Sequence, residues 1–331
     1  MISIILPVYN GEVFLRTAID SILKQTFSNF ELIIVNDGSN DGTEDIVLNL
    51  RNCDPRVIYI PFLENSGLPA SLNHGIKIAK GNYITWTSHD NILMPYALEY
   101  MLKELVNTNS DFVYADCSVV NEKGEETGFL KAKPIENILF SNVVHACFLY
   151  RREVYKKVGE YDSDLKLIED WDYWLRCAQK CKMTNISQTL YQFRHHDSSL
   201  TSQIKTERLK KKLFENNKYK MLENLVSDKR IRNKELVIEF FLNTDHTIYS
   251  VLSKDVFPTL INEIKYFTKL FPALSSRRVR YVIANRIYDF IVRKSEYHDL
   301  RLINLITTGG FLIKSLPPVR TAVLLKKALL R

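Results

Sequence analysis

Four groups of polar residues in this sequence are of types that can act on charged ligands. Two are loops with one acid each, Asn36-Asp37-Gly38-Ser39 and Ser88-His89-Asp90-Asn91, and the third is the acidic pair Glu169-Asp170. The fourth comprises the basic residues Arg194 and His196. Carboxylates bind hard cations or accept protons, whereas arginine contacts phosphate oxygens. The sequence therefore contains groups for metal binding, proton transfer and phosphate binding, if the fold brings them together.

The residues around the first two groups predict the sheet that would position them. Short apolar runs predict strands, and apolar residues at helical spacing predict helices between them. The strands are Ile2–Leu6, Glu31–Val35, Val57–Ile60 and Asn82–Trp86, and two of the helices are Glu12–Thr26 and Pro69–Lys80. Strands that are apolar throughout are typical of a parallel sheet with helices on both faces. We therefore predict an α/β fold with a doubly wound, mostly parallel sheet.

In such a sheet, ligands bind outside the carboxyl ends of the strands. Asp37 and Asp90 each follow a predicted strand, so we expect them to share one ligand-binding edge. Neither a Gly-x-Gly-x-x-Gly motif after the first strand nor a P-loop motif occurs, so dinucleotide and P-loop sites have no support. Structural explanations stay open, because Asn-Asp-Gly is common in turns and Asp90 would also suit a cap for a helix near Pro95.

Four segments, taken in order, resemble glycosyltransferase family 2, a large group of inverting enzymes with a GT-A fold. They are Ile4–Asn10, Leu32–Ser39, Asn65–Ile76 and Glu169–Arg176. The resemblance covers about residues 2–200 and falls on the predicted strand ends. It implies a GT-A-like nucleotide-sugar glycosyltransferase domain over residues 1–203, and it leaves a helical region over residues 204–331 outside the match.

The resemblance implies a donor site at the first two strand ends. Asp37 would accept a hydrogen bond from the N3–H of a uracil, and Asn65 is assigned to donor binding as well. The base pocket would be lined by Pro7, Val8, Tyr9 and Asn10. The implied donor is therefore a UDP-sugar.

The resemblance also implies a divalent metal ion. Asp90 matches the last aspartate of the family's metal motif and would bind Mg²⁺ or Mn²⁺. His196 would complete the metal sphere or approach the diphosphate, and Arg194 would bind phosphate oxygens. The family commonly shows Asp-x-Asp-Asp, but here Ser88 and Asn91 replace two of the acids. Because one carboxylate remains, metal binding could be loose, completed by other groups, or partly replaced.

The acidic pair matches the family's Glu-Asp motif, which implies the catalytic role. Asp170 would be the general base that removes the proton of the acceptor hydroxyl, and Glu169 and Asp172 would orient the site or bind acceptor hydroxyls. Trp171 would stack on a sugar face. Structural alternatives remain, because acids are stabilised at a helix N-terminus and a tryptophan is often part of the core.

Together these assignments imply an inverting glycosyltransferase that moves a hexosyl or N-acetylhexosaminyl group to a hydroxyl of a glycan or lipid-linked acceptor, in the assembly of a bacterial surface polysaccharide. One alternative is a catalytically silent scaffold subunit that binds a nucleotide sugar. A sugar nucleotidyltransferase is less favoured, because Pro7-Val8-Tyr9-Asn10 stands where a glycine-rich basic loop would be expected.

Charge is distributed unevenly along the 331 residues. Residues 1–200 carry 19 Lys/Arg and 26 Asp/Glu, a net charge of −7, whereas residues 201–331 carry 26 and 12, a net charge of +14. The second part predicts helices over Ile204–Leu225, Lys234–Phe241, Phe257–Phe271 and Arg277–Arg293. Its basic amphipathic segments suit an anionic membrane face or, equally, a solvated helical bundle. Nucleic-acid binding is not expected, because no known nucleic-acid-binding motif accompanies the charge.

The chain also carries signals about its cellular setting. Its five cysteines show no CxxC spacing, which argues against a disulfide framework or a zinc site and favours a reducing environment. The apolar run at the N-terminus ends at Pro7, too early for a signal peptide. We therefore expect a cytoplasmic protein that binds peripherally to the inner face of the cell membrane.

Overall fold

The fold is described from a computed structural model covering residues 1–242, 257–272, 274, 276–293, 316–318 and 320–321. The chain divides into two compact units, Met1–Asn217 and Lys218–Arg331. The division falls inside helix α8 (Arg208–Leu225), so the first unit extends beyond the predicted boundary at residue 203.

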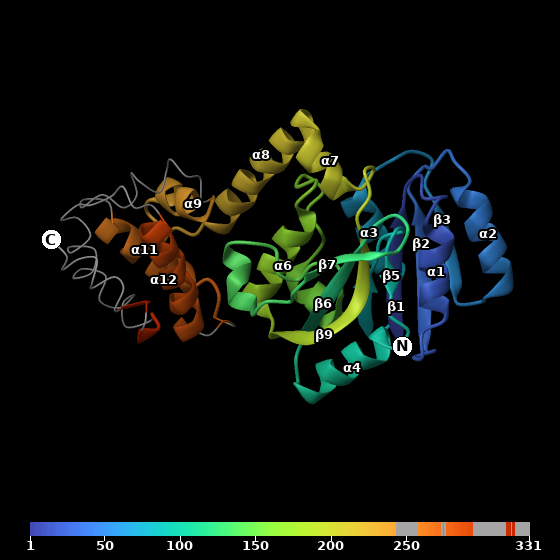
Figure 1. The fold of residues 1–331 in the computed structure, drawn as a ribbon, viewed down its shortest axis with the longest axis horizontal. Helices are drawn as coiled ribbons and strands as arrows, with labels where there is room; N and C mark the ends of the chain where they lie inside the picture. The colour runs from blue at the N-terminus through green and yellow to red at the C-terminus, as the bar shows by residue number, and fades with distance from the viewer. Residues whose placement is uncertain (243–256, 273, 275, 294–315, 319, 322–331) are drawn as a thin grey trace. The chain divides into compact units, whose positions relative to one another are not determined.

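The first unit contains a nine-stranded sheet in the order β3-β2-β1-β4-β8-β6-β9-β5, with β7 paired to β6 (Figure 1). The strands are β1 (Ile2–Val8), β2 (Phe30–Asn36), β3 (Val57–Pro61), β4 (Tyr83–Trp86), β5 (Ile92–Leu93), β6 (Phe112–Val120), β7 (Glu126–Leu130), β8 (Phe148–Arg151) and β9 (Met183–Arg194). The predicted α/β sheet is confirmed, and strands β3-β2-β1-β4 are all parallel, as are β6 and β9. Beyond β4 the sheet is mixed, because β6, β7 and β8 follow one another without an intervening α-helix and pair antiparallel.

Helices cover both faces of this sheet. The helices of the first unit before α8 are α1 (Leu15–Leu23), α2 (Thr43–Cys53), α3 (Leu68–Ile78), α4 (Ala97–Asn107), the 3-10 helix η1 (Ile135–Leu139), α5 (Arg152–Val158), α6 (Glu169–Lys180) and α7 (Leu200–Thr206). The helices predicted over Glu12–Thr26 and Pro69–Lys80 are confirmed as the shorter α1 and α3.

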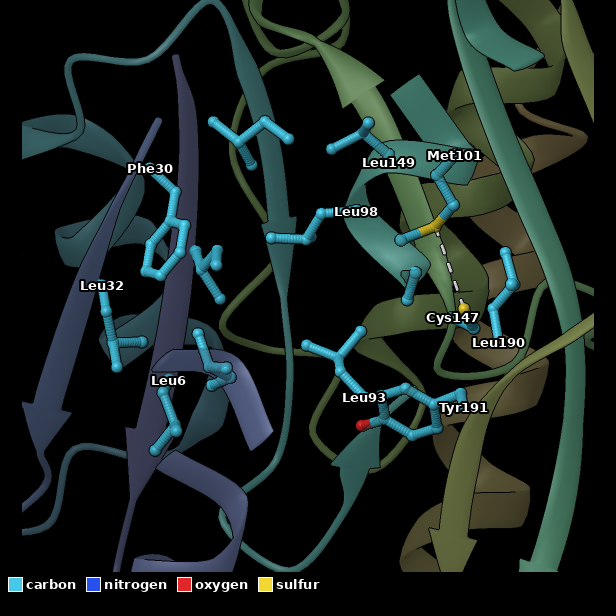
Figure 2. Packing of buried hydrophobic residues seen from close by; sticks show 14 of the residues in the cluster. Leu6, Phe30, Leu32, Leu93, Leu98, Met101, Cys147, Leu149, Leu190 and Tyr191 are labelled. Carbon is cyan, nitrogen blue, oxygen red and sulfur yellow. Dashed lines mark hydrogen bonds between the residues drawn. The ribbon is translucent and has the colours of Figure 1, made fainter. Parts of the chain in front are cut away.

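The two faces of β1 belong to different parts of the core. Leu6 packs on one face with α1 and α4, and Figure 2 shows Leu98 and Met101 of α4 pointing into this cluster. On the other face, α3 approaches so closely that a Cβ on Gly75 would lie 2.6 Å from Ile5 Cγ2. Burial on both sides explains why the strand is apolar except at Ser3 and predictable from its sequence.

A second core of aromatic rings fixes helix α6. The Trp174 ring packs edge-on against Phe148, with 4.6 Å between the ring centroids, and against Phe112 at 5.1 Å. Tyr173 of the same helix stacks on Tyr161 at 4.0 Å. Large buried aromatic surfaces of this kind contribute several kcal/mol each by order of magnitude. They hold the first turn of α6, which carries the acidic pair, in place.

The second unit is helical, as the spacing of its apolar residues predicted. Its described helices include α9 (Lys234–Leu242), α11 (Phe257–Thr268) and α12 (Ser276–Arg293). Phe241 of α9 packs on Phe267 of α11 at 4.5 Å between ring centroids. The helix predicted over Ile204–Leu225 is broken at Glu207 into α7 and α8. The amphipathic segment predicted at residues 311–331 lies almost wholly outside the described residues, and no described helix combines the length and apolarity needed to cross a membrane.

Candidate active site

Asp37, at the carboxyl end of β2, ties that strand to the loop that precedes α3. Its side chain is buried, and its two carboxylate oxygens accept hydrogen bonds from the main-chain amides of Ser66 (2.8 Å) and Gly67 (2.9 Å). Gly38 has a φ of +73°, and a Cβ there would lie 2.7 Å from the main chain of Glu64. A glycine is therefore required at this turn. Asp37 holds the loop before α3 in its shape through two hydrogen bonds and also supplies a carboxylate there.

The loop after β1 is held against the loop after β2. The Asn10 main-chain amide donates to Ser39 Oγ at 2.9 Å, and the Asn40 amide donates back to Asn10 Oδ1 at 3.0 Å. Asn10 itself has a left-handed φ of +51°, a conformation that asparagine tolerates. Of the predicted pocket residues Pro7, Val8, Tyr9 and Asn10, the first two are buried, and Tyr9 and Asn10 are exposed. Asn65 is exposed on the facing loop.

Asp90 and His196 meet, as the resemblance implied. The His196 Nε2 atom lies 3.0 Å from Asp90 Oδ2, and its Nδ1 atom lies 2.8 Å from Ser198 Oγ. The imidazole ring also packs on Phe14, with 5.1 Å between the ring centroids. Three contacts therefore fix this histidine, which is itself buried.

The pair has one property expected of a cation site. Asp90 Oδ1 is buried and accepts no hydrogen bond from any part of the chain that the structure describes. A buried carboxylate oxygen without a partner is costly unless a ligand satisfies it. Within the described residues, however, no cluster of three or more His, Cys, Asp or Glu side chains could hold a metal ion. The side chains fit a cation only if a bound ligand or water supplies further oxygen atoms.

Arg194 is placed differently from the prediction that it binds phosphate. Its Nε atom donates to the Asp90 carbonyl at 3.0 Å, and Nη1 donates to the carbonyls of Asn121 and Glu122 at 3.0 and 2.9 Å. The guanidinium also lies over the Phe14 ring. Arg194 is therefore buried and holds the segment that carries Asp90 against residues 121 and 122.

Asn91, which replaces an acid of the family motif, also serves the framework. It is buried, and its Oδ1 atom accepts the main-chain amide of Arg194 at 2.7 Å. This bond attaches the loop after β4 to the end of β9. It explains how Asp90 and His196 come together from positions that are far apart in the sequence.

Glu169 and Asp170 form the first turn of α6. The Asp170 side chain is partly exposed, and its oxygens accept hydrogen bonds from the Trp171 main-chain amide at 2.6 Å and from Asn142 Nδ2 at 2.7 Å. Glu169 is 5% exposed, and its Oε2 atom has no hydrogen-bond partner among the described residues. Asp170 is thus the more exposed member of the pair.

Burial raises the pKa of both carboxyl groups above their ordinary values. For Glu169, burial is the largest cause, and the negative charge of Asp170 adds to it. For Asp170, burial also dominates, while the hydrogen bonds from Trp171 and Asn142 partly offset it and lower the pKa. Two neighbouring carboxyl groups resist ionising together, so Glu169 retains its proton to higher pH and Asp170 carries the charge first.

The other two residues predicted for the acceptor point into the fold. Trp171 is 7% exposed, and its indole nitrogen donates to the Ile138 carbonyl at 2.8 Å. Asp172 is buried and pairs with Arg176, with Arg176 Nε 2.8 Å from its Oδ2 atom. The core interpretation of Trp171 fits this position better than stacking on a sugar.

Contacts also connect the acidic pair with the loop that Asp37 shapes. A Cβ on Gly67 would lie 3.9 Å from Lys166 Nζ, so this lysine lies over the start of α3. Nearby, the Asn73 side chain exchanges two hydrogen bonds with the main chain of Tyr161, at 2.8 and 2.9 Å. The segment leading to Asp170 is therefore hydrogen-bonded to α3, the helix that follows the loop bound by Asp37.

Two residues of this region were not predicted to have a role. Asn142 contacts Asp170 directly, and His89 packs so close to Gly11 that a Cβ there would lie 2.8 Å from its ring. Burial lowers the pKa of His89. Nothing in the local pattern around Asn142 indicates a site, because it stands alone before an apolar run.

The buried state of Glu169 predicts how stability depends on pH. A carboxyl group whose pKa is raised by folding stabilises the protein at pH values below its pKa in the unfolded chain, near 4.5. This contribution is lost as the pH rises through the pKa of the folded state. Glu169→Gln should therefore be at least about 1 kcal/mol more stable, relative to wild type, at about pH 8 than at about pH 5. Urea denaturation at both pH values measures this difference. Glu153→Gln, at an exposed position, is the matched control, and equal pH dependence of the two variants would contradict the prediction.

The chain was compared with known proteins. Residues 3–159 match the profile of Glycosyl transferase family 2. An uncharacterized glycosyltransferase of Methanocaldococcus jannaschii is 31% identical over 222 residues, which cover 63% of this chain and 76% of that protein. One of Rickettsia typhi is 34% identical over 214 residues, which cover 61% of this chain and 66% of that protein. For a Rickettsia felis relative at 31% identity, the match covers 62% of this chain but 36% of the relative.

Solved structures show the same fold. The crystal structure of S. aureus TarS 1-349 in complex with UDP-GlcNAc superimposes with a TM-score of 0.61 at 19% sequence identity, covering 93% of this chain and 92% of that one. The likeness supports the GT-A-like sheet and the helical C-terminal region. The sequence matches show that this chain belongs to glycosyltransferase family 2, and the structural likeness shows its GT-A-like fold.

Proposed function

We propose that this protein is an inverting glycosyltransferase that moves a sugar from a UDP-sugar to a hydroxyl group of a glycan or lipid-linked acceptor. The observation that carries the proposal is Asp170, a partly exposed carboxylate whose two oxygens are both oriented by hydrogen bonds. Such a group can accept a proton from a substrate hydroxyl. Family membership supplies the class of reaction.

In this reaction, Asp170 acts as the general base. The acceptor oxygen attacks the anomeric carbon as its proton passes to Asp170, and the bond from that carbon to the diphosphate breaks on the opposite face. This in-line displacement inverts the anomeric centre. A base works best when its pKa approaches the working pH, and burial moves the pKa of Asp170 in that direction.

We assign donor binding to the loops after β1, β2 and β3. A carboxylate oxygen can accept two hydrogen bonds, so Asp37 can hold its loop and still accept the N3–H of a uracil. Tyr9, Asn10 and Asn65 are the exposed residues of these loops assigned to donor binding. The TarS structures with UDP-GlcNAc and with UDP support this class of donor through the shared fold.

We also propose that Asp90 and His196 hold a Mg²⁺ or Mn²⁺ ion together with donor oxygens, because Asp90 Oδ1 is buried without a partner. When bound, such an ion would neutralise charge on the diphosphate. The residues themselves orient the site: Ser198 and Phe14 fix the His196 ring, and Asn91 and Arg194 fix the loop of Asp90.

Asp170→Asn tests the base assignment. Loss of a general base should lower the turnover number by about 10²–10⁴-fold while donor affinity stays within about twofold, because the amide cannot accept the proton. Transfer and hydrolysis would be measured with a panel of nucleotide sugars and acceptors. Asp164→Asn, at an exposed position in the preceding loop, is the matched control. Undiminished turnover by Asp170→Asn would rule out the assignment, and donor binding by the wild type without transfer or hydrolysis would identify a silent scaffold instead.

Metal dependence is tested by donor binding as well as by activity. Calorimetry with UDP should show tighter binding in Mn²⁺ than in EDTA, by about tenfold or more, and Asp90→Ala should abolish that difference. Asp90 is the carboxylate with an unpartnered buried oxygen, so its removal leaves the ion without its acidic ligand. UDP affinity and turnover that are indifferent to both EDTA and Mn²⁺ would contradict the metal proposal.

We further propose that the acceptor is presented at a membrane surface inside the cell, as for a bacterial surface polysaccharide. The net charge of +14 in residues 201–331 favours contact with anionic lipid. The full chain should sediment with vesicles that contain anionic lipid and not with purely zwitterionic vesicles, and the binding should weaken by about tenfold or more as salt is raised. Failure to bind anionic vesicles at low salt would contradict this localisation.

A further inference from the structure

The segment that leads into the acidic pair contains an unfavourable backbone conformation. Leu167 has a φ of +72°, in the left-handed region that side chains with a Cβ rarely adopt. Glu169 follows two residues later as the first residue of α6. A strained residue of this kind persists only where its surroundings hold it. The contacts that hold Leu167 therefore also set where α6, the helix that carries Asp170, begins.

The peptide group before Leu167 has a buried partner from a distant part of the sequence. Asn217 of α8 donates from Nδ2 to the Lys166 carbonyl at 2.8 Å. Asn217 is 7% exposed, whereas its neighbour Asn216 is exposed. The Lys166 carbonyl belongs to the peptide bond that joins Lys166 to Leu167. This hydrogen bond therefore fixes the orientation of that peptide plane, and with it the φ angle of Leu167.

The chain that leads to Asn217 through α7 and α8 is anchored at its other end by hydrogen bonds to His196. Ser199 caps α7, and both its main-chain amide and its Oγ atom donate to the His196 carbonyl, at 3.1 and 2.7 Å. Helix α8 follows α7 after the break at Glu207. The chain from His196 to Asn217 thus connects the Asp90–His196 pair with the approach to Asp170, within one compact unit.

We propose that Asn217 is a positioning residue for Asp170: by holding the Lys166–Leu167 peptide it fixes the start of α6, and with it the base. The inference rests on the proposed function, in which Asp170 accepts the acceptor proton. Asn217 acts on the reaction through Leu167 and α6 and has no role in contacting the substrates. Its effect is therefore expected on the turnover number and not on donor binding.

Asn217→Asp removes the N–H donor at nearly constant size. The turnover number should fall about ten- to a hundredfold, because small displacements of a catalytic group are costly, while the donor dissociation constant stays within about twofold. Asn216→Asp, with the same change of charge at an exposed position, should stay within about twofold of wild type. Asn217→Gln, which keeps an amide donor on a longer side chain, should recover part of the loss.

A double-mutant cycle separates positioning from general destabilisation. Glycine adopts a positive φ readily, so in a Leu167→Gly background the loss caused by Asn217→Asp should be smaller than in wild type. If the double variant loses turnover by the product of the two single losses, the substitutions act independently and the inference is overturned. Equal turnover numbers for Asn217→Asp and Asn216→Asp would also overturn it. If Asn217→Asp proves too unstable to assay, the comparison of Asn217→Gln with Leu167→Gly and their double mutant provides the same test. Absence of transfer by the wild-type chain would instead reject the proposed function.

Discussion

Two adjacent carboxyl groups at the start of one helix are the constraint on which the site depends. Burial raises the pKa of both Glu169 and Asp170, and the negative charge of Asp170 raises the pKa of Glu169 further, so ionising both is unfavourable. The aromatic core behind α6 offsets the cost of this arrangement, because Trp174 is fully buried against Phe112 of β6 and Phe148 of β8. The result is one buried acid that keeps its proton to higher pH and one half-buried carboxyl group that ionises first.

The part of the molecule to which we assign the donor is built by a different kind of contact. Here loops after parallel strands are joined through side chains that bind main-chain groups, as Asp37 binds the amides of Ser66 and Gly67 and Asn91 binds the amide of Arg194. These bonds give the loops a fixed shape before any ligand arrives, which lowers the entropy that binding has to overcome. Asp90 is the exception, since one of its buried oxygens has no partner among the described residues.

Much of the first unit could be predicted from its sequence, because strands β1 and β2 are buried at every position and are therefore mostly apolar. The same logic placed Asp37 and Asp90 after strands, and the pairing of Asp90 with His196 agreed with the family motif. The mixed half of the sheet was not predictable, since nothing local specifies that β8 inserts between β4 and β6. Side-chain direction was also hidden: the inward turn of Arg194, the burial of Trp171 and the contact of Asn142 with Asp170 depend on tertiary neighbours.

The central claim is that Asp170 works as a base whose pKa is raised by burial. The pH dependence of kcat/KM for the wild-type enzyme tests it directly, because this quantity reports the ionisation of the free enzyme. The structure predicts that activity falls on acidification through a midpoint well above the ordinary aspartate value of 3.8. Activity that stays constant down to that ordinary value would contradict the account.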